Sequence, residues 1–331
     1  MKLFITHNSA LEYWRAHPHS AEILKRRRRN VVVPNDPPTA KALDQFDLHG
    51  LSLPLSVAVG SKNARRISKR VKTHVIDKPL PEGSMVDVGN GLFVASPELC
   101  FVQMAASLPF ANLIELGIEL CGTYSLCEPD DFYDIANPDD YTPFDDYENN
   151  GIIKRDPLTD VKKLSAFVAR MTGAPGQRKA ARALRYIVDG SASPRETLLV
   201  IMLTLPYNLG GYKLVQPTMN ARIVVDDSSK GYNGKSVYYC DLFWPAANLA
   251  VEYDSDIHHT GASRLASDSI RRGNLASVGI TVVTVTNQQV KNILKFEKLA
   301  RFMADRLKKN LRYDENPGFV EAQRQLRKLL L

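Results

Sequence analysis

The second half of the chain alternates apolar runs of strand length with longer amphipathic segments that have the period of helices. Ser193 begins a predicted helix, and the strand candidates of residues 212–226 precede a hairpin that reverses at residues 245–248. A helix at about 262–278 ends at Gly279, and a last strand and two amphipathic helices follow. Strands flanked by helices at both ends predict an α/β (α+β) unit with a mixed sheet covered by helices.

The first half has a different pattern. Residues 53–59, 70–76 and 91–96 are rich in apolar and β-branched side chains and predict strands. A helical segment follows, with Ser96 as its N-cap and Pro97 at its first position. The pattern predicts a separate, smaller α+β domain before the C-terminal one.

Two biased stretches lie between the halves. Residues 128–149 contain nine acids and three prolines, which predicts an exposed loop. Residues 158–189 are basic and predict two helices broken between Gly173 and Gly176. We therefore expect domains at 1–127 and 193–331, joined by an acidic loop and a basic helical linker at 128–192.

Composition narrows the class of protein. A chain of 331 residues is long enough for two domains, and no run approaches the roughly 20 apolar residues of a membrane-spanning helix. The first residues are too polar for a secretion signal, so we expect a cytoplasmic protein. The four cysteines contain no C-x-x-C pair, which argues against a zinc knuckle. The net charge of +7 favours a polyanionic partner.

The predicted hairpin carries an unusual set of carboxylates. If Ala246 and Ala247 form the turn, Asp241 faces Glu252 across the two strands, and Asp254 shares the face of Glu252. Like charges at that spacing repel. The carboxylates must therefore have a raised pKa, face water or share a cation. Apolar neighbours on both sides of Glu252 favour a covered strand over an acidic surface. Carboxylates suit Mg²⁺ or Mn²⁺, and such an ion would promote phosphodiester hydrolysis.

The segments YYCDLFWPAANLAVEYDSDIHH and DSIRRGNLASVGITVVTVT resemble the endonuclease-like domain of the PD-(D/E)XK superfamily related to very-short-patch repair (Vsr-like) endonucleases. The resemblance covers about residues 193–290 and implies a restriction-endonuclease-like sheet flanked by helices. It implies that Asp241 and Glu252 hold the ion, with His258 orienting or deprotonating the water. The matching positions are Asp241, Glu252, Asp254, His258, Asp268 and Arg271, with Gly279 before the last strand.

The chain departs from this family at two positions. Ser255 stands where a Gly is expected, and Asp254 occupies the place of the lysine that gives the superfamily its name. Water activation would then depend on the metal or on His258. These departures leave two hypotheses open: a metal-dependent DNA endonuclease, and a DNA-binding regulator whose nuclease fold has lost turnover.

Other residues have two interpretations each. Glu196 would join the metal site by analogy with similar nuclease domains, or would complete a capping box with Ser193. Arg271 would bind the scissile phosphate, with Arg272 beside it, or both would form ion pairs on a surface helix. His258 would be catalytic or simply a polar residue after a strand.

The N-terminal region is similar to the AbiEi-type antitoxin-like region that precedes nuclease-like domains in some bacterial proteins. The resemblance rests on THNSALEYWR and on the order of the strand and helix segments up to about residue 125. It implies a bacterial source, a DNA-contacting or regulatory module, and a protein partner from the same operon. Phosphate contacts would come from the cations that crowd the segment between two predicted strands, unless these are only solvated: Arg65, Arg66, Lys69, Arg70 and Lys72.

The combined reading is a cytoplasmic, Mg²⁺- or Mn²⁺-dependent endonuclease acting on DNA in phage defence, a toxin–antitoxin system or repair. A third hypothesis is an RNA-directed nuclease, because no residue in the sequence is recognisable as a reader of the 2′-hydroxyl.

Overall fold

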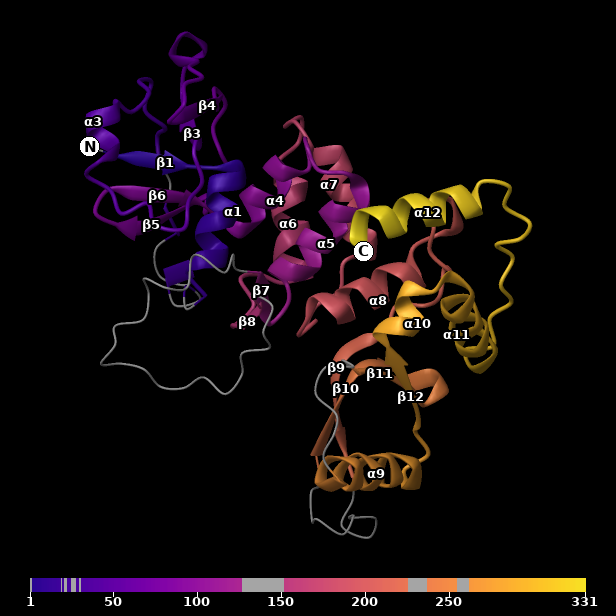
Figure 1. Cartoon of the computed structure of the whole chain (residues 1–331). Helices are drawn as coiled ribbons and strands as arrows, with labels where there is room; N and C mark the ends of the chain where they lie inside the picture. Colours follow the sequence, from indigo (N-terminus) through magenta and orange to yellow (C-terminus); the bar gives the residue numbers. More distant parts are fainter. Residues whose placement is uncertain are drawn as a thin grey trace. The chain divides into compact units, whose positions relative to one another are not determined.

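The computed structural model describes residues 2–18, 20, 23–24, 28–29, 31–126, 152–225, 237–254 and 262–331, without the side chains of residues 28–29, 40 and 262–268. The chain divides into two compact units, Met1–Ile187 and Val188–Leu331 (Figure 1). The acidic segment 128–149, Ser255 and His258 lie outside the described residues. Each unit is mixed α/β.

The first unit is built on a six-stranded mixed sheet. The predictions of strands at residues 53–59, 70–76 and 91–96 are confirmed. The short strand β1 is central, parallel to β6 and antiparallel to β3. The strand order is β2 (Arg28–Arg29), β5 (Met85–Gly89), β6 (Leu92–Ala95), β1 (Leu3–Ile5), β3 (Leu55–Val59) and β4 (Val71–Val75).

Helices complete the first unit. Ser96 caps α4 as predicted, because its hydroxyl accepts a 3.2 Å hydrogen bond from the N–H of Leu99. The helical segment after it divides at Pro109 into two helices. The elements are α1 (His7–Ala16), α3 (Ala40–Leu43), η1 (Lys62–Ala64), α4 (Pro97–Met104), α5 (Phe110–Leu120), α6 (Val161–Arg170), α7 (Gln177–Ala183) and η4 (Leu184–Tyr186), with a two-stranded sheet of β7 (Tyr124–Leu126) and β8 (Ile152–Lys154).

The basic segment at 158–189 lies in the first unit as far as Ile187, where that unit ends. It forms the two expected helices, but α6 packs against α4, and α7 packs against α4 and α5. At the turn between them, Gly176 has φ 83°, and a Cβ there would lie 2.6 Å from the carbonyl oxygen of Val102. Only glycine permits this close approach, so the segment packs on the helices before it rather than forming a free linker.

The second unit contains a four-stranded sheet, in which β9, β10 and β11 are antiparallel and β12 is parallel to β11. The mixed sheet flanked by helices is confirmed, and Figure 1 shows it between α9 and the helices α8, α10 and α11. The elements are α8 (Pro194–Thr204), η5 (Tyr207–Leu209), β9 (Thr218–Val224), β10 (Val237–Trp244), η7 (Pro245–Ala247), β11 (Leu249–Asp254), α9 (Ala262–Ser277), β12 (Thr281–Thr286), α10 (Asn287–Lys291), α11 (Ile293–Arg306) and α12 (Phe319–Leu330).

The hairpin has the predicted register. Trp244 pairs with Leu249 and Leu242 with Val251, and the turn is a short 3₁₀ segment closed by a left-handed Asn248 with φ 45°. Asparagine tolerates this conformation better than most residues. The first three residues of β11 are fully buried, as expected for a strand covered on both faces.

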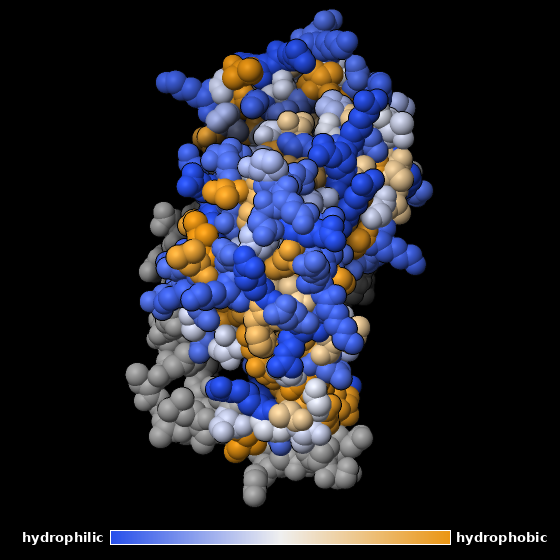
Figure 2. Space-filling model, turned by 90° about the vertical axis from the view of Figure 1, so that its right-hand side faces the viewer, coloured by the Kyte–Doolittle hydropathy of each residue, from blue (hydrophilic) through white to orange (hydrophobic). Residues whose placement is uncertain are grey.

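The described residues contain no helix that is both long and apolar enough to cross a membrane. On the face drawn in Figure 2, hydrophilic side chains predominate and hydrophobic ones form small separate groups. Scattered apolar residues of this kind are normal at protein surfaces, so this face gives no indication of a large apolar docking area.

Candidate functional site

Three carboxylates from three different elements interact in the second unit, and we call them the carboxylate cluster. Glu196 lies in the first turn of α8, Asp241 in β10 and Glu252 in β11. Glu196 is buried, with 7% of its surface exposed, and the other two are partly buried. Burial, and after it the charge of Asp241, raises the pKa of both glutamates, so the cluster concentrates negative charge away from water.

Glu196 takes part in the cap of α8 and also belongs to the carboxylate cluster. It helps to cap α8, but its carboxylate accepts hydrogen bonds from the N–H of Ala192 (2.9 Å) and the hydroxyl of Ser193 (3.0 Å) rather than from the Ser193 backbone. It also accepts a 2.6 Å bond from the amide of Asn220. Burial, followed by the charge of Asp241, raises the pKa of Glu196 to about 7. The cap therefore does not remove Glu196 from the site.

Asn220 is a site residue that sequence reasoning missed. It lies in β9, and the pairs formed by its two neighbours, Met219 with Leu242 and Ala221 with Cys240, place it across from Asp241. Its φ of 45° is unusual for a strand. Its amide donates to Glu196 and to the carbonyl oxygen of Gly190 (2.9 Å). No pattern in the sequence marks this asparagine as a site residue, because it stands within an ordinary predicted strand.

Asp241 is held by the neighbouring strand. Its Oδ2 accepts a 2.8 Å hydrogen bond from the backbone N–H of Tyr253, the residue after Glu252. Burial raises the pKa of Asp241, while this hydrogen bond and the charge of Arg271 lower it by less. The predicted proximity of Asp241 and Glu252 is thus present, and the two charges repel across the hairpin.

Glu252 is the cluster member that binds a protein cation. Arg271 Nη2 in α9 lies 2.6 Å from Glu252 Oε1 and also donates to the carbonyl oxygen of Tyr239. Burial still leaves the pKa of Glu252 raised, although Arg271 and the exposed Arg272 lower it. Arg271 Nε is buried and has no hydrogen-bond partner within the described chain. The residue expected to bind phosphate is therefore engaged with a carboxylate in this structure.

The remaining predicted residues are not all brought together. Asp254 ends β11 on the face of Glu252 and pairs with Thr286 in the ladder. His258 lies outside the described residues, and of Asp268 only the helical backbone is described.

The predicted phosphate contacts of residues 65–72 lie in the other unit. There Arg70 pairs with Asp44 at 2.6 Å, Lys69 is exposed, and Arg65 and Arg66 line a cavity. The site therefore consists of the carboxylate cluster with Asn220 and Arg271.

The donor chemistry of the cluster fits a hard divalent cation. Three carboxylates offer oxygen ligands, and one arginine only partly offsets their charge. In this structure the three carboxylates bind other groups of the same chain. In the part of the chain that is described, no group of three or more His, Cys, Asp or Glu side chains is placed to hold a metal ion. Binding an ion would require Glu252 to exchange Arg271 for the metal.

Comparison of the chain with protein families, with curated proteins and with solved structures finds no match.

Proposed function

We propose that the second unit is a restriction-endonuclease-like domain that hydrolyses phosphodiester bonds in DNA with Mg²⁺ or Mn²⁺. The observation that carries the proposal is the carboxylate cluster, in which burial raises the pKa values of Glu196, Asp241 and Glu252. Among the described residues, one ion pair to an arginine partly offsets their charge. Uncompensated buried carboxylates destabilise a fold, and a divalent cation is the ligand that would reverse this penalty.

Each residue of the site would have its own role in the hydrolysis. Glu196 and Asp241 would hold the ion, with Glu252 joining them after release from Arg271. The bound ion would acidify a water molecule and stabilise the departing oxygen. Arg271, freed from Glu252, would bind the phosphate through its planar guanidinium, whose Nε is already without a partner in the described chain. Asp254 would assist on the same face, and the resemblance assigns water orientation to His258.

DNA as the substrate is supported by charge. The chain carries a net charge of +7, and the exposed Arg272 lies close enough to lower the pKa of Glu252. Cations beside an acidic centre attract the phosphate backbone, which would otherwise be repelled by the carboxylates. We extend the proposal to a role in phage defence, a toxin–antitoxin system or repair, in the cytoplasm of a bacterium, with a partner protein encoded nearby.

A second candidate is a DNA-binding regulator without turnover. It is favoured by the Arg271–Glu252 ion pair and by the lack, in the described part of the chain, of three metal-binding side chains placed for an ion. In this case the arginine would replace the metal permanently, and the domain would bind DNA through its cations alone.

Cleavage assays separate the two candidates. Supercoiled plasmid, DNA oligonucleotides and RNA oligonucleotides are incubated with the protein across Mg²⁺ and Mn²⁺ concentrations, and DNA affinity is measured by fluorescence anisotropy in EDTA. Asp241→Asn keeps the acceptor for the Tyr253 N–H and removes one charge. The exposed Glu321→Gln is the matched control, because it removes a carboxylate outside the cluster.

The nuclease proposal predicts metal-dependent cleavage that Asp241→Asn abolishes and Glu321→Gln retains. Intact plasmid under every metal condition, with DNA binding unchanged or tighter in Asp241→Asn, would instead establish the regulator. Cleavage of RNA but not DNA would support metal-dependent phosphodiester hydrolysis and would replace DNA with RNA as the substrate.

A further inference from the structure

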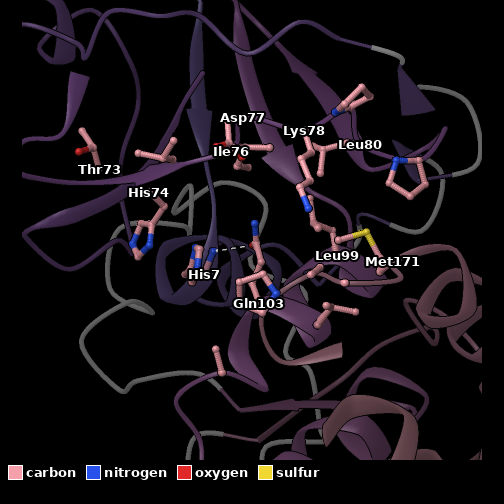
Figure 3. A pocket seen from close by; sticks show the side chains of 18 of the residues that line it. His7, Thr73, His74, Ile76, Asp77, Lys78, Leu80, Leu99, Gln103 and Met171 are labelled. Atoms are coloured by element: carbon pink, nitrogen blue, oxygen red, sulfur yellow. Dashed lines mark hydrogen bonds between the residues drawn. The ribbon is translucent and has the colours of Figure 1, made fainter. Parts of the chain in front are cut away.

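The first unit contains a cavity of about 1290 Å³ that the proposed nuclease activity does not use. One wall is β4 with the segment after it, and the other is α4 with the turn between α6 and α7 (Figure 3). Small-molecule sites commonly measure roughly 300–1,000 Å³, so this cavity has room for a large ligand. All of its lining residues belong to one compact unit.

Cations outnumber acids around this cavity. The basic lining residues are Arg65, Arg66, Lys72, Lys78 and Arg170, and the acidic ones are Asp77 and Glu82. Within the described ranges none of the five cations forms an ion pair, whereas nearby Arg70 pairs with Asp44. Arg65, Arg66, Lys72 and Lys78 are exposed, so their charges are available to an anion entering from water. A phosphate-bearing ligand satisfies this excess of positive charge.

The inner part of the cavity is apolar and aromatic. Leu99, Val102 and Met171 contribute side chains from the helical wall. The rings of His7 and His74 stack with centroids 3.6 Å apart and lie side by side in Figure 3. Burial, with the charge of Lys72, lowers the pKa of His7 to about 3 and that of His74 to about 4. The imidazoles are therefore neutral at pH 7 and offer a flat surface for stacking instead of further charge.

Two polar groups add specificity to this inner part. The Oε1 of Gln103 accepts a 3.0 Å hydrogen bond from the backbone N–H of His7, which fixes the side-chain amide in the cavity wall (Figure 3). His74 Nε2 is buried and has no partner among the residues that the structure describes. His7 itself has φ 50°, a strained conformation for a non-glycine residue that tends to occur at ligand sites.

We propose that this cavity binds a nucleotide, with its base against the imidazole pair and the apolar wall and its phosphates on Arg65, Arg66, Lys72 and Lys78. An inorganic anion would use the cations but not the apolar wall, and a purely apolar ligand would leave the cations unused. The volume accommodates a nucleoside triphosphate or a dinucleotide. The same chemistry is offered by a free nucleotide and by the terminal nucleotide of a nucleic-acid strand.

Isothermal titration calorimetry in EDTA tests the proposal independently of the metal-dependent site in the other unit. The probes are adenosine triphosphate, guanosine triphosphate, adenosine, inorganic tripolyphosphate and a 5′-phosphorylated single-stranded tetranucleotide. We expect micromolar binding of at least one nucleotide and at least tenfold weaker binding of adenosine and of tripolyphosphate. The tetranucleotide distinguishes the sources: tighter binding than the triphosphates identifies a strand end, and weaker binding identifies a free nucleotide.

Variants locate the binding in this cavity. The double variant Arg66→Gln/Lys72→Gln, which changes two exposed cations, should weaken nucleotide binding at least tenfold. Lys69→Gln is the matched control, because Lys69 is an exposed cation on the same segment that does not line the cavity. His74→Phe keeps the stacking ring but removes Nε2, so it should retain more affinity than His74→Ala, which loses both.

Circular dichroism and thermal unfolding confirm that each variant folds. No heat with any nucleotide or with the tetranucleotide at millimolar concentration, equal binding of tripolyphosphate and triphosphate, or equal loss in Lys69→Gln and the double variant would each overturn the proposal.

Discussion

Arg271 Nη2 lies 2.6 Å from Glu252 Oε1, and this ion pair places a protein cation where a metal-bound nuclease would need a divalent one. The arginine side chain is 35% exposed and the glutamate 19%, so the pair is open enough to exchange partners. Under the proposed metal-dependent activity, the strength of this pair would set how readily the carboxylate cluster takes up an ion.

Replacing Arg271 with Met should therefore strengthen metal binding and weaken the metal-free fold. Glu252 would lose its cation, and the free energy of unfolding should fall by about 1 kcal/mol, a figure reduced because the pair is partly solvated. Mn²⁺ affinity, measured by calorimetry, should rise about tenfold, since the competing cation is gone. Unchanged or weaker Mn²⁺ binding in a folded variant would contradict a metal role for Glu252. DNA cleavage should nevertheless fall, because the phosphate would lose its guanidinium.

Asp241→Asn should stabilise the metal-free protein even though it abolishes cleavage. Burial raises the pKa of Asp241, so its ionised form destabilises the fold at neutral and alkaline pH. A group with a raised folded-state pKa contributes stability that is present at low pH and is lost as the pH rises. The variant should gain about 1 kcal/mol at pH 8, the size of an ordinary single substitution, and nothing below pH 4. Urea unfolding at both pH values measures this, and a loss of stability at pH 8 would indicate that the charge is compensated.

Metal affinity should depend on pH through Glu196. Burial and the charge of Asp241 raise its pKa to about 7, so an incoming ion must displace a proton below that pH. The Mn²⁺ dissociation constant should rise about tenfold per pH unit below pH 7 and level off above it. Calorimetry at pH 6, 7 and 8 measures the slope. In Glu196→Gln the slope should flatten, because the amide can still accept from Asn220 and donate to the Ser193 hydroxyl but has no proton to lose.

The stacked histidines should make the first unit sensitive to acid. Their pKa values of about 3 and about 4 in the folded chain lie below the ordinary 6.5, so the unfolded chain takes up protons that the folded chain does not. Stability should fall as the pH drops from about 6.5 towards 4.

Replacing His74 with Phe preserves the stack, and His74 Nε2 has no partner to lose within the described residues. The difference in the free energy of unfolding between pH 7.5 and pH 5 should shrink by about 1 kcal/mol relative to the unchanged chain, a figure reduced because His74 is partly solvated. An unchanged difference would show that His74 is already protonated in the fold. Urea titrations followed by circular dichroism supply both values.

Much of the local structure of this protein is predictable from short stretches of sequence. The hairpin register follows from the alternation on either side of Pro245 to Asn248, and it brings Asp241 near Glu252. The caps at Ser96 and Ser193 follow from a hydroxyl placed before Pro and Glu. These features depend on interactions within about a dozen residues, which is why the pattern alone predicts them.

Only the tertiary structure decided the partners of the charged groups. Glu196 bonds to Asn220, 24 residues away, and Glu252 pairs with Arg271, 19 residues away, because a sheet and two helices bring them together. The same holds for the stacking of His7 on His74 and for the packing of the basic helices on α4 and α5. The sequence by itself determined which residues carry charge and which face of a strand they occupy. Which opposite charge or ring each one meets depends on long-range packing, since many alternative pairings have similar local energies.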